Sequence, residues 1–309
     1  MKKTISYLIV FTSLFFLTNC SEDTPIELSQ PEALTVSSEF ALKIELSWDE
    51  VKSALGYNIY RADYDFVLED AIFTLIDKVE GLETYTDISV NSSSQYYYRI
   101  EAFNGNVVSE LSVESIGETR VITAEEAFDI LAEYTGGSVY DANNASEVPD
   151  AIIEIINDNA VANTDLVFLI DNTLSMSDDI AQVKSSINNI IAELPSGVRL
   201  GMATYNDANT TTDWYNSIGL DTDFTNTINF LNSISVFGGG DYPESVYDGL
   251  YLTLNQMSWS STSERIVIVI GDAPPLEGSL TNYSLKDVVD EANRLDIDVN
   301  LYPILIDGF

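Results

Sequence analysis

The hydrophobic pattern of the second half of the chain predicts alternating buried strands and amphipathic helices. Five consecutive apolar residues at 166–170 lie between turn-forming residues, which is typical of a strand buried on both faces of a parallel sheet. A second apolar run at 266–270, which follows Arg265, predicts another such strand over 265–270. Apolar residues at helical spacing follow the first strand at Ile180, Val183, Ile187, Ile190 and Ile191. Further strands are expected at 198–205, 214–218 and 299–306, and further helices at 224–234, 244–257 and 285–295. This alternation favours an α/β fold.

Oxygen-bearing side chains follow both apolar runs. Asp171 ends the first strand, and Thr173 and Ser175 follow at a spacing of two, which in extended backbone places side chains on one side of the chain. Asp272 ends the second run. Open α/β sheets bind their ligands at the carboxyl ends of strands. The pattern indicates a site for a hard cation, although a strand-ending Asp and a helix-capping Ser are also common structural features.

The run Asp171-x-Thr173-x-Ser175 resembles the metal-ion-dependent adhesion site of von Willebrand factor A (VWA) domains, in the threonine-containing variant of its motif. Two further landmarks of that family follow in order: the segment 238–244, which reads G-G-G-D-Y-P-E, and the strand before Asp272. The resemblance implies an α/β, Rossmann-like domain with a mainly parallel central sheet. It also implies that Thr173 and Ser175 bind a metal directly, while Asp171 and Asp272 act at least partly through water.

The loop 238–244 is expected to supply the remaining ligand. Many VWA domains use a threonine there; in this chain Asp241 is the expected ligand and Glu244 the alternative. Glycines at 238–240 allow a close approach of the backbone. The resemblance implies Mg²⁺, with Mn²⁺ or Ca²⁺ as alternatives, and octahedral Mg²⁺ leaves a position for a carboxylate of a protein partner. Three acidic groups lower the electrophilicity of the metal. The chemical group through which the partner binds the metal is therefore left open.

The segment 123–157 is expected to form a helix, a strand and a helix, beginning with a capping box at Thr123 and Glu126. Its Thr-Gly-Gly at 135–137 resembles the end of a VWA domain, where a helix leads into the last strand and the last helix. Here it precedes the first strand. We therefore expect a circularly permuted VWA domain over 121–309, with 121–158 as the displaced last helix–strand–helix. The alternative is a remnant of a lost upstream copy beside a truncated domain.

The first half of the chain alternates apolar and polar residues in short runs at 41–48, 56–61, 73–76 and 96–102, which predicts a β-sandwich. Residues 31–119 resemble a fibronectin type III domain. Trp48 matches the core tryptophan of that family, Tyr96 its tyrosine corner, and the run Thr-Tyr-Thr-Asp at 84–87 a common strand end. These aromatic residues are expected to fill the core, and no catalytic cluster is evident.

Composition limits the function of the chain. The chain has 309 residues with 13 basic and 50 acidic side chains, a formal net charge of −37, no His and a single Cys. Such a charge disfavours nucleic acid and favours divalent cations or basic partners. The absence of His excludes a Ser-His-Asp triad, and one Cys excludes an internal disulfide and a Cys/His zinc site.

The N-terminus resembles a bacterial lipoprotein signal. A positively charged start, Met-Lys-Lys, is followed by a short apolar run at 6–17 and by Leu-Thr-Asn-Cys at 17–20. Asn19 replaces the usual Gly or Ala of the lipobox. We expect a signal peptide at 1–19, a lipidated Cys20 that anchors the chain in a membrane, and a tether at 20–30. The acidic residues after Cys20 resemble the tract that sends some Gram-negative lipoproteins to the cell exterior.

These patterns predict a multidomain, non-enzymatic lipoprotein of the cell envelope. It is expected on the outer membrane, facing outwards, and is expected to bind a protein or extracellular-matrix-like ligand through a metal adhesion site. Two alternatives remain. One is a structural or scaffold lipoprotein whose metal site is not functional. The other is a metal-dependent hydrolase similar to haloacid-dehalogenase-type phosphatases, but these need a second Asp where this chain has Thr173.

Overall fold

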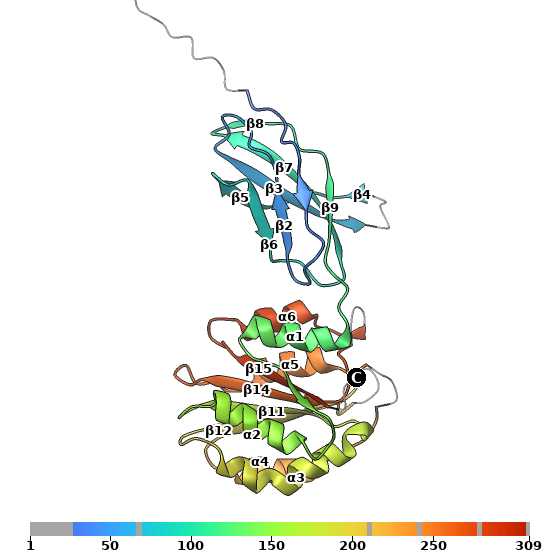
Figure 1. Ribbon diagram of the computed structural model, residues 1–309, viewed down its shortest axis with the longest axis vertical. Coiled ribbons are helices and arrows are strands. Elements are labelled where there is room, and N and C mark those ends of the chain that lie inside the picture. The colour runs from blue at the N-terminus through green and yellow to red at the C-terminus, as the bar shows by residue number, and fades with distance from the viewer. Residues whose placement is uncertain (1–26, 66–69, 209–211, 240–242, 277–279, 307–309) are drawn as a thin grey trace, which may run out of the picture.

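The computed structural model describes residues 27–65, 70–208, 212–239, 243–276 and 280–306, which fold into a β-sandwich followed by an α/β domain (Figure 1). Cys20 and Asp241 lie outside the described residues. The order of the two domains and their classes are as the sequence predicts.

The first domain packs two sheets of short strands. One sheet has the order β1-β2-β6, and in the other β3 pairs with β4, β5 and β7, while β7 also pairs with β8 and β9. The strands are β1 Thr35–Val36, β2 Ile44–Ser47, β3 Gly56–Asp65, β4 Asp70–Ala71, β5 Thr74–Glu80, β6 Thr84–Asp87, β7 Gln95–Asn104, β8 Val107–Val108 and β9 Ser115–Glu118. All of these pairings are antiparallel, as in a fibronectin type III-like sandwich.

Aromatic residues fill the core of the sandwich, as the resemblance to fibronectin type III domains implies. Trp48 is 6% exposed and meets the ring of Tyr57 edge-on at 5.1 Å between centroids. Tyr96 is also buried, and its hydroxyl accepts a hydrogen bond from the backbone N–H of Asn91 at 2.9 Å. This bond back to an upstream loop is the tyrosine corner expected of the fold.

The second domain is built around a six-stranded sheet in the order β10-β15-β14-β11-β12-β13. Neighbouring strands are parallel except for β13, which pairs antiparallel to β12 at one edge. The strands are β10 Tyr140–Ala142, β11 Asp165–Asp171, β12 Arg199–Tyr205, β13 Tyr215–Asp221, β14 Arg265–Gly271 and β15 Asn300–Ile306. Every residue of β11 and β14 is buried, which explains their uninterrupted apolar sequences.

Helices cover both faces of this sheet (Figure 1). The helices α1 Ala124–Thr135, α5 Val246–Gln256 and α6 Leu285–Ala292 share one apolar core with one face, and α2 Val148–Asn159, α3 Ser177–Ala192 and α4 Thr225–Ser233 share another with the opposite face. The sheet therefore divides the core into two layers.

The segment upstream of β11 takes part in this fold. The capping box of α1 is present, with the Thr123 side chain accepting from the backbone of Glu126. Strand β10 pairs in parallel with β15, so Tyr140 faces Ile304 in register. Helix α2 starts at Val148, because the preceding residues form a turn closed by hydrogen bonds of the Glu147 side chain.

The two domains meet through an apolar contact. Ala41 and Leu42 of the sandwich are 6% and 4% exposed and belong to the core layer that contains α1 and α6. The backbone N–H of Arg120 donates to the carbonyl of Phe40 at 2.9 Å. The sandwich therefore rests on the α1 and α6 side of the α/β domain, as Figure 1 also shows.

Candidate metal centre

Three neighbouring parallel strands end in polar residues at one edge of the sheet. Strand β11 ends at Asp171, β14 is followed by Asp272, and β12 is followed by Asn206 and Asp207. The registers place Asp171 beside Tyr205 and Ile170 beside Ile270. The carboxylates predicted from the two apolar runs thus lie at the same edge of the sheet.

The turn after β11 brings the predicted hydroxyl and carboxylate groups together. Thr173 Oγ1 and Ser175 Oγ are 3.1 Å apart, and Ser175 Oγ donates to Asp272 Oδ1 at 3.1 Å. The backbone N–H of Thr173 donates to Asp171 Oδ1 at 2.8 Å. Thr173 is fully buried, whereas Ser175 is exposed, so the cluster opens to solvent on one side.

The backbone of this turn differs from the expected extended form. Thr173 is extended, but Leu174–Met176 form a 3-10 turn in which the N–H of Met176 donates to the carbonyl of Thr173. Met176 is fully buried in the core of the α3 face. The burial of this side chain favours the tight turn, and the tight turn, rather than an alternating strand, directs Ser175 towards Asp272.

Burial dominates the electrostatics of Asp171. It raises the pKa of this carboxyl to about 7, opposed by the hydrogen bond from Thr173 and reinforced by the charges of Asp272 and Asp207. Asp171 Oδ2 is buried and has no hydrogen-bond partner among the described residues. A cation at this position would relieve the repulsion and favour the ionised form.

The glycine loop lies against the turn, as its sequence predicts. A Cβ on Gly239 would lie 2.8 Å from Thr173 Cβ, and Gly239 has a φ of +72°. The backbone N–H of Phe237 donates to the carbonyl of Asn172 at 3.1 Å. Only glycine permits this approach, so the loop that carries Asp241 starts beside the cluster.

Glu244, the alternative loop ligand, is buried at the far end of the same loop. Its backbone N–H donates to the carbonyl of Pro274 at 2.8 Å, and its own carbonyl accepts from Leu276 at 2.7 Å. These bonds join the glycine loop to the segment that follows Asp272. Its side chain is 3% exposed, and its charge contributes to raising the pKa of Tyr205.

Asp207 and Tyr205 also belong to this cluster, although neither was predicted as a site residue from the sequence. Asp207 is 1% exposed, and its charge raises the pKa of Asp171. The sequence pattern could have identified Asp207, because this residue follows a buried strand, as Asp272 does, and Asp171 ends one. Tyr205 is fully buried beside the same carboxylates, and no periodicity predicts where its hydroxyl lies.

A buried carboxylate on α5 holds the loop that follows β14. Asp248 accepts hydrogen bonds from the Thr281 hydroxyl at 3.0 Å, from the backbone N–H of Asn282 at 3.0 Å and from that of Tyr283 at 3.1 Å. Its role is structural, because its oxygens are already bonded to the loop. Asp248 was likewise not selected from the sequence.

The donors present suit a hard cation. Two carboxylates, Asp171 and Asp272, and two hydroxyls, Thr173 and Ser175, offer only oxygen, which Mg²⁺, Mn²⁺ and Ca²⁺ prefer. The unpartnered Asp171 Oδ2 is an acceptor that such a cation or its water would satisfy. No three His, Cys, Asp or Glu side chains within the described ranges form a preformed metal cage. That is consistent with a site that depends on hydroxyls and on a loop residue outside those ranges.

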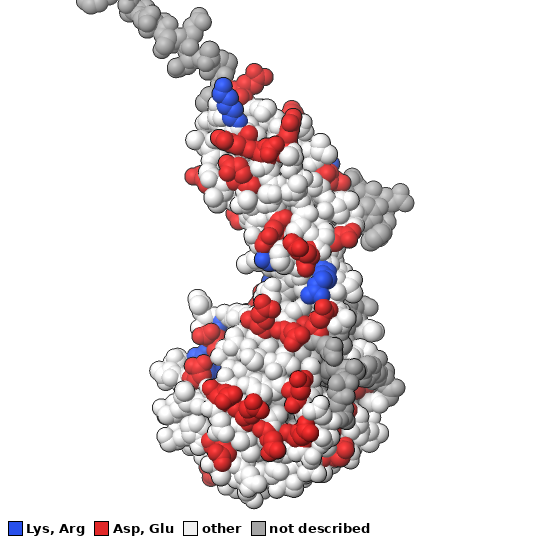
Figure 2. Space-filling model, in the orientation of Figure 1, with Lys and Arg blue, Asp and Glu red and all other residues white. Residues whose placement is uncertain are grey.

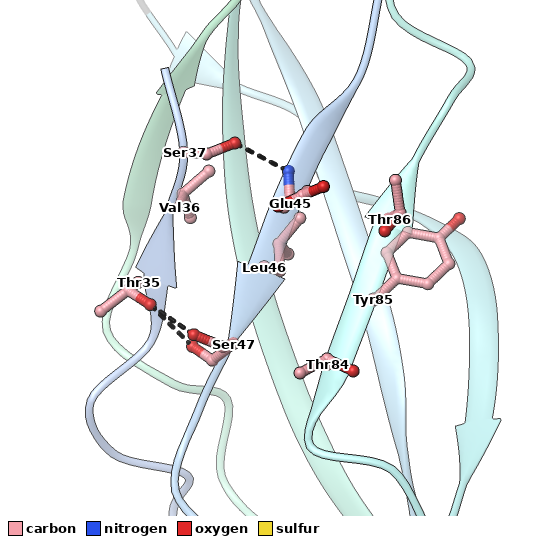
Figure 3. Close-up of a pocket in the computed structure, with 9 residues that line it drawn as sticks. All are labelled: Thr35, Val36, Ser37, Glu45, Leu46, Ser47, Thr84, Tyr85 and Thr86. Atoms are coloured by element: carbon pink, nitrogen blue, oxygen red, sulfur yellow. Dashed lines mark hydrogen bonds between the residues drawn. The ribbon is translucent and has the colours of Figure 1, made fainter. Parts of the chain in front are cut away.

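A separate hollow lies on the three-stranded sheet of the sandwich (Figure 3). Its hydroxyl groups bond within the sheet: Thr35 Oγ1 lies 2.7 Å from Ser47 Oγ, and Ser37 Oγ accepts from the backbone N–H of Glu45 at 2.9 Å. Glu45 is the one acidic residue that lines it. The hollow lacks the convergent carboxylates of the sheet edge in the second domain.

Comparison with known proteins agrees with the fold of the second domain. Residues 165–301 match the family model described as the von Willebrand factor A domain. An alpha-protein kinase of Dictyostelium discoideum, vwkA, is 31% identical over 115 residues, which are 36% of this chain and 18% of that protein. The C-terminal part of the chain therefore contains a VWA domain with a mixed, mostly parallel sheet.

The first domain has neighbours among solved structures. A Fn3-like protein from Clostridium thermocellum is 23% identical, with a TM-score of 0.26, and the match covers 30% of this chain and 94% of that one. The FN1–FN3 domains of chicken CNTN1 are 24% identical, with a TM-score of 0.26 and 31% of each chain covered.

Proposed function

We propose that the chain is a lipid-anchored adhesion or binding protein of the cell envelope, whose VWA domain binds a protein ligand through a divalent cation. The observation that carries this proposal is the hydrogen bond from Ser175 Oγ to Asp272 Oδ1, beside Thr173. It gathers a hydroxyl pair and a carboxylate at the open edge of the sheet. These are the groups that a metal-ion-dependent adhesion site requires.

Mg²⁺ is the proposed cation, with Mn²⁺ and Ca²⁺ as alternatives. Thr173 and Ser175 would bind it through their hydroxyls, Asp171 and Asp272 at least partly through water, and Asp241 or Glu244 would complete the set. Mg²⁺ keeps several exchangeable waters in its octahedral shell. A carboxylate of the partner would replace one of these waters, on the side where Ser175 is exposed.

The surface charge supports cation-dependent protein binding. Acidic side chains outnumber basic ones by 50 to 13, and Figure 2 shows Asp and Glu spread over the visible face of both domains. A divalent cation offers a local positive group on such a surface, so a partner's carboxylate can bind there despite the net charge. The same charge opposes binding to nucleic acid.

Anchorage at Cys20 is proposed from the sequence alone. The lipobox-like residues 17–20 follow a short apolar signal, and acyl chains at one cysteine would hold the protein on the outer membrane. In the part of the chain that the structure describes, none of the helices is long and apolar enough to cross a membrane. The Cys20→Ser variant is expected to leave the membrane fraction or to remain unprocessed. Unchanged processing and membrane partitioning would contradict lipidation.

Binding rather than catalysis is proposed for the strand-end site. Thr173 occupies the position where a phosphatase of the haloacid dehalogenase type would need its second Asp. A hydroxyl there cannot act as the acid and base of that reaction near neutral pH. The remaining alternative is a scaffold protein that uses its sheet edge without a metal.

Capture of partners from intact cells tests the proposed function. Partners should be recovered with the wild-type protein in Mg²⁺ and lost with chelator or with the Asp171→Ala, Ser175→Ala double variant. Ser185→Ala, which removes an exposed hydroxyl on α3, is the matched control and should behave as wild type. Recovery of the same partners in chelator would favour the scaffold alternative.

A further inference from the structure

Tyr205 places a phenol hydroxyl inside the candidate metal centre. It is the last residue of β12 and is fully buried, with its ring against Gly249 of α5. Its hydroxyl lies against Gly271, the last residue of β14. A Cβ on Gly271 would lie 2.5 Å from Tyr205 Oη and 3.7 Å from Asp171 Oδ2. The missing side chain at Gly271 therefore leaves a space that both oxygens border.

Both oxygens lack a hydrogen-bond partner among the described residues. Tyr205 Oη and Asp171 Oδ2 are each buried and unpartnered. Buried polar atoms in folded proteins nearly always have a partner, and an exception calls for an explanation. Two unpartnered oxygens that border the same space at a candidate site are explained if they bond to each other when a cation is bound.

Charge favours the hydroxyl as the donor of this pair. Burial, and then the charges of Asp171, Glu244 and Asp272, raise the pKa of Tyr205 well above its ordinary value. The phenol therefore stays neutral and keeps its proton at physiological pH. Asp171 Oδ1 already accepts from the backbone N–H of Thr173, so Oδ2 is the oxygen of this carboxyl group that still needs a donor.

We propose that Tyr205 is a positioning residue of the metal centre, whose hydroxyl donates a hydrogen bond to Asp171 Oδ2 when the cation is bound. The proposal rests on the proposed metal-dependent function. Groups that bond to metal ligands from behind fix the orientation of those ligands, and their loss weakens metal binding about 10- to 100-fold. Tyr205 would act through Asp171 without touching the cation.

The Tyr205→Phe variant separates this role from a structural one, because it removes the hydroxyl and keeps the ring. We expect Mn²⁺ or Mg²⁺ to bind roughly tenfold more weakly by calorimetry. The melting temperature in chelator should stay the same or rise, because an unpartnered buried hydroxyl is removed. A purely structural tyrosine would show the opposite: a lower melting temperature and unchanged affinity.

Tyr302→Phe is the matched control. Tyr302 is also a buried tyrosine of the central sheet, but its hydroxyl donates to Asn159 Oδ1 at 3.1 Å, away from the metal centre. Its loss should lower the melting temperature in chelator and leave metal affinity within twofold of wild type. The proposal therefore predicts opposite results for the two variants: Tyr205→Phe weakens metal binding without lowering the melting temperature, and Tyr302→Phe lowers the melting temperature without weakening metal binding.

A second pair of variants tests the geometry. Gly271→Ala would place a methyl group 2.5 Å from Tyr205 Oη and displace the hydroxyl, so it should also weaken metal binding. In the Tyr205→Phe background the same change should add little, because the clashing oxygen is absent. Equal and additive losses from the two changes would overturn the proposal.

The outcomes distinguish this proposal from the one on which it rests. If wild type binds no more metal than the Asp171→Ala, Ser175→Ala double variant, the proposed function fails and the role of Tyr205 fails with it. If wild type binds specifically and Tyr205→Phe binds within twofold of it, the positioning role alone is overturned.

Discussion

The hydroxyl of Ser175 lies 3.1 Å from Oδ1 of Asp272, although 97 positions separate them in the chain. Two neighbouring parallel strands, β11 and β14, end beside each other and create this contact. The 3-10 turn at Leu174–Met176 aims the hydroxyl across the gap. The relationship shows how sheet topology gathers oxygen donors from distant segments at one edge.

The first prediction concerns pH. The pKa of Asp171 is about 7 in the folded protein and about 3.9 in an unfolded chain. Between these values the folded state binds more protons, so in chelator the free energy of unfolding should fall as pH rises from about 4 to about 7. Asp171→Asn should remove roughly 2–4 kcal/mol of this decline. Urea unfolding of wild type and Asp171→Asn at pH 5 and pH 8 measures this fall in the free energy of unfolding.

The exposed Asp178 at the start of α3 supplies the control for that measurement. Asp178→Asn should keep the decline of wild type. An unaltered decline in Asp171→Asn would show that the burial of this carboxyl does not produce the effect. Added Mg²⁺ should stabilise wild type more at pH 8 than at pH 5, because protons compete with the metal.

The second prediction concerns a buried ion pair in the sandwich. The fully buried Asp87 accepts hydrogen bonds from Arg61 at 2.8 Å, from the Tyr98 hydroxyl at 2.9 Å and from the Ser89 N–H at 2.8 Å. Burial opposes ionisation of Asp87, but the bonds from Ser89 and Arg61 outweigh it and lower its pKa. Its contribution to stability is therefore present above pH 4 and lost as pH falls through the lowered pKa.

Asp87→Asn should reduce the free energy of unfolding by about 3 kcal/mol, because it leaves the Arg61 charge without its partner. The exposed ion pair of Lys78 and Glu80 is the control. Glu80→Gln should change the free energy of unfolding by less than about 1 kcal/mol. Denaturant unfolding at pH 7 measures both. Equal effects of the two substitutions would contradict the role given to burial.

The sequence predicted the main elements of both domains because their patterns are local. The uninterrupted apolar runs of β11 and β14 identified the central strands, and the polar residues after them identified Asp171 and Asp272. The glycines of the loop predicted its close approach to Thr173. Each of these signals is contained within a few consecutive residues.

The features that the sequence did not predict depend on tertiary packing. The 3-10 turn before α3 follows from the burial of Met176, and the position of the Tyr205 hydroxyl follows from the space above Gly271. Ala41 and Leu42 look like core residues of the sandwich in sequence, yet they pack on the helices of the other domain. Hydrophobic periodicity and residue spacing do not show which surfaces pack against each other in the folded chain.

The third prediction concerns the proposed permutation of the VWA domain. The pairing of β10 with β15 and the packing of α2 on the sheet support it. A fragment that starts at Asn163 would lack α1, β10 and α2 and expose the apolar surface beneath them. Burial contributes roughly 25 cal/mol per Å² against a total stability of about 5–15 kcal/mol. That fragment should not melt cooperatively.

A fragment that starts at Arg120 should fold without the sandwich. It keeps every strand of the central sheet and loses the apolar contact with Ala41 and Leu42 and a few hydrogen bonds to the sandwich. Calorimetric melting of both fragments measures the difference. If the Asn163 fragment melts cooperatively at the same temperature as the Arg120 fragment, the proposed permutation is contradicted. The segment upstream of Asn163 would then be a relic.

Metal binding by the strand-end site tests the central claim most directly. Calorimetry with Mg²⁺ and Mn²⁺ should show one specific site in wild type, above the weak background expected at a charge of −37. The Asp171→Ala, Ser175→Ala double variant should retain only that background. Equal affinity and stoichiometry in the two proteins would contradict the assignment of the metal centre.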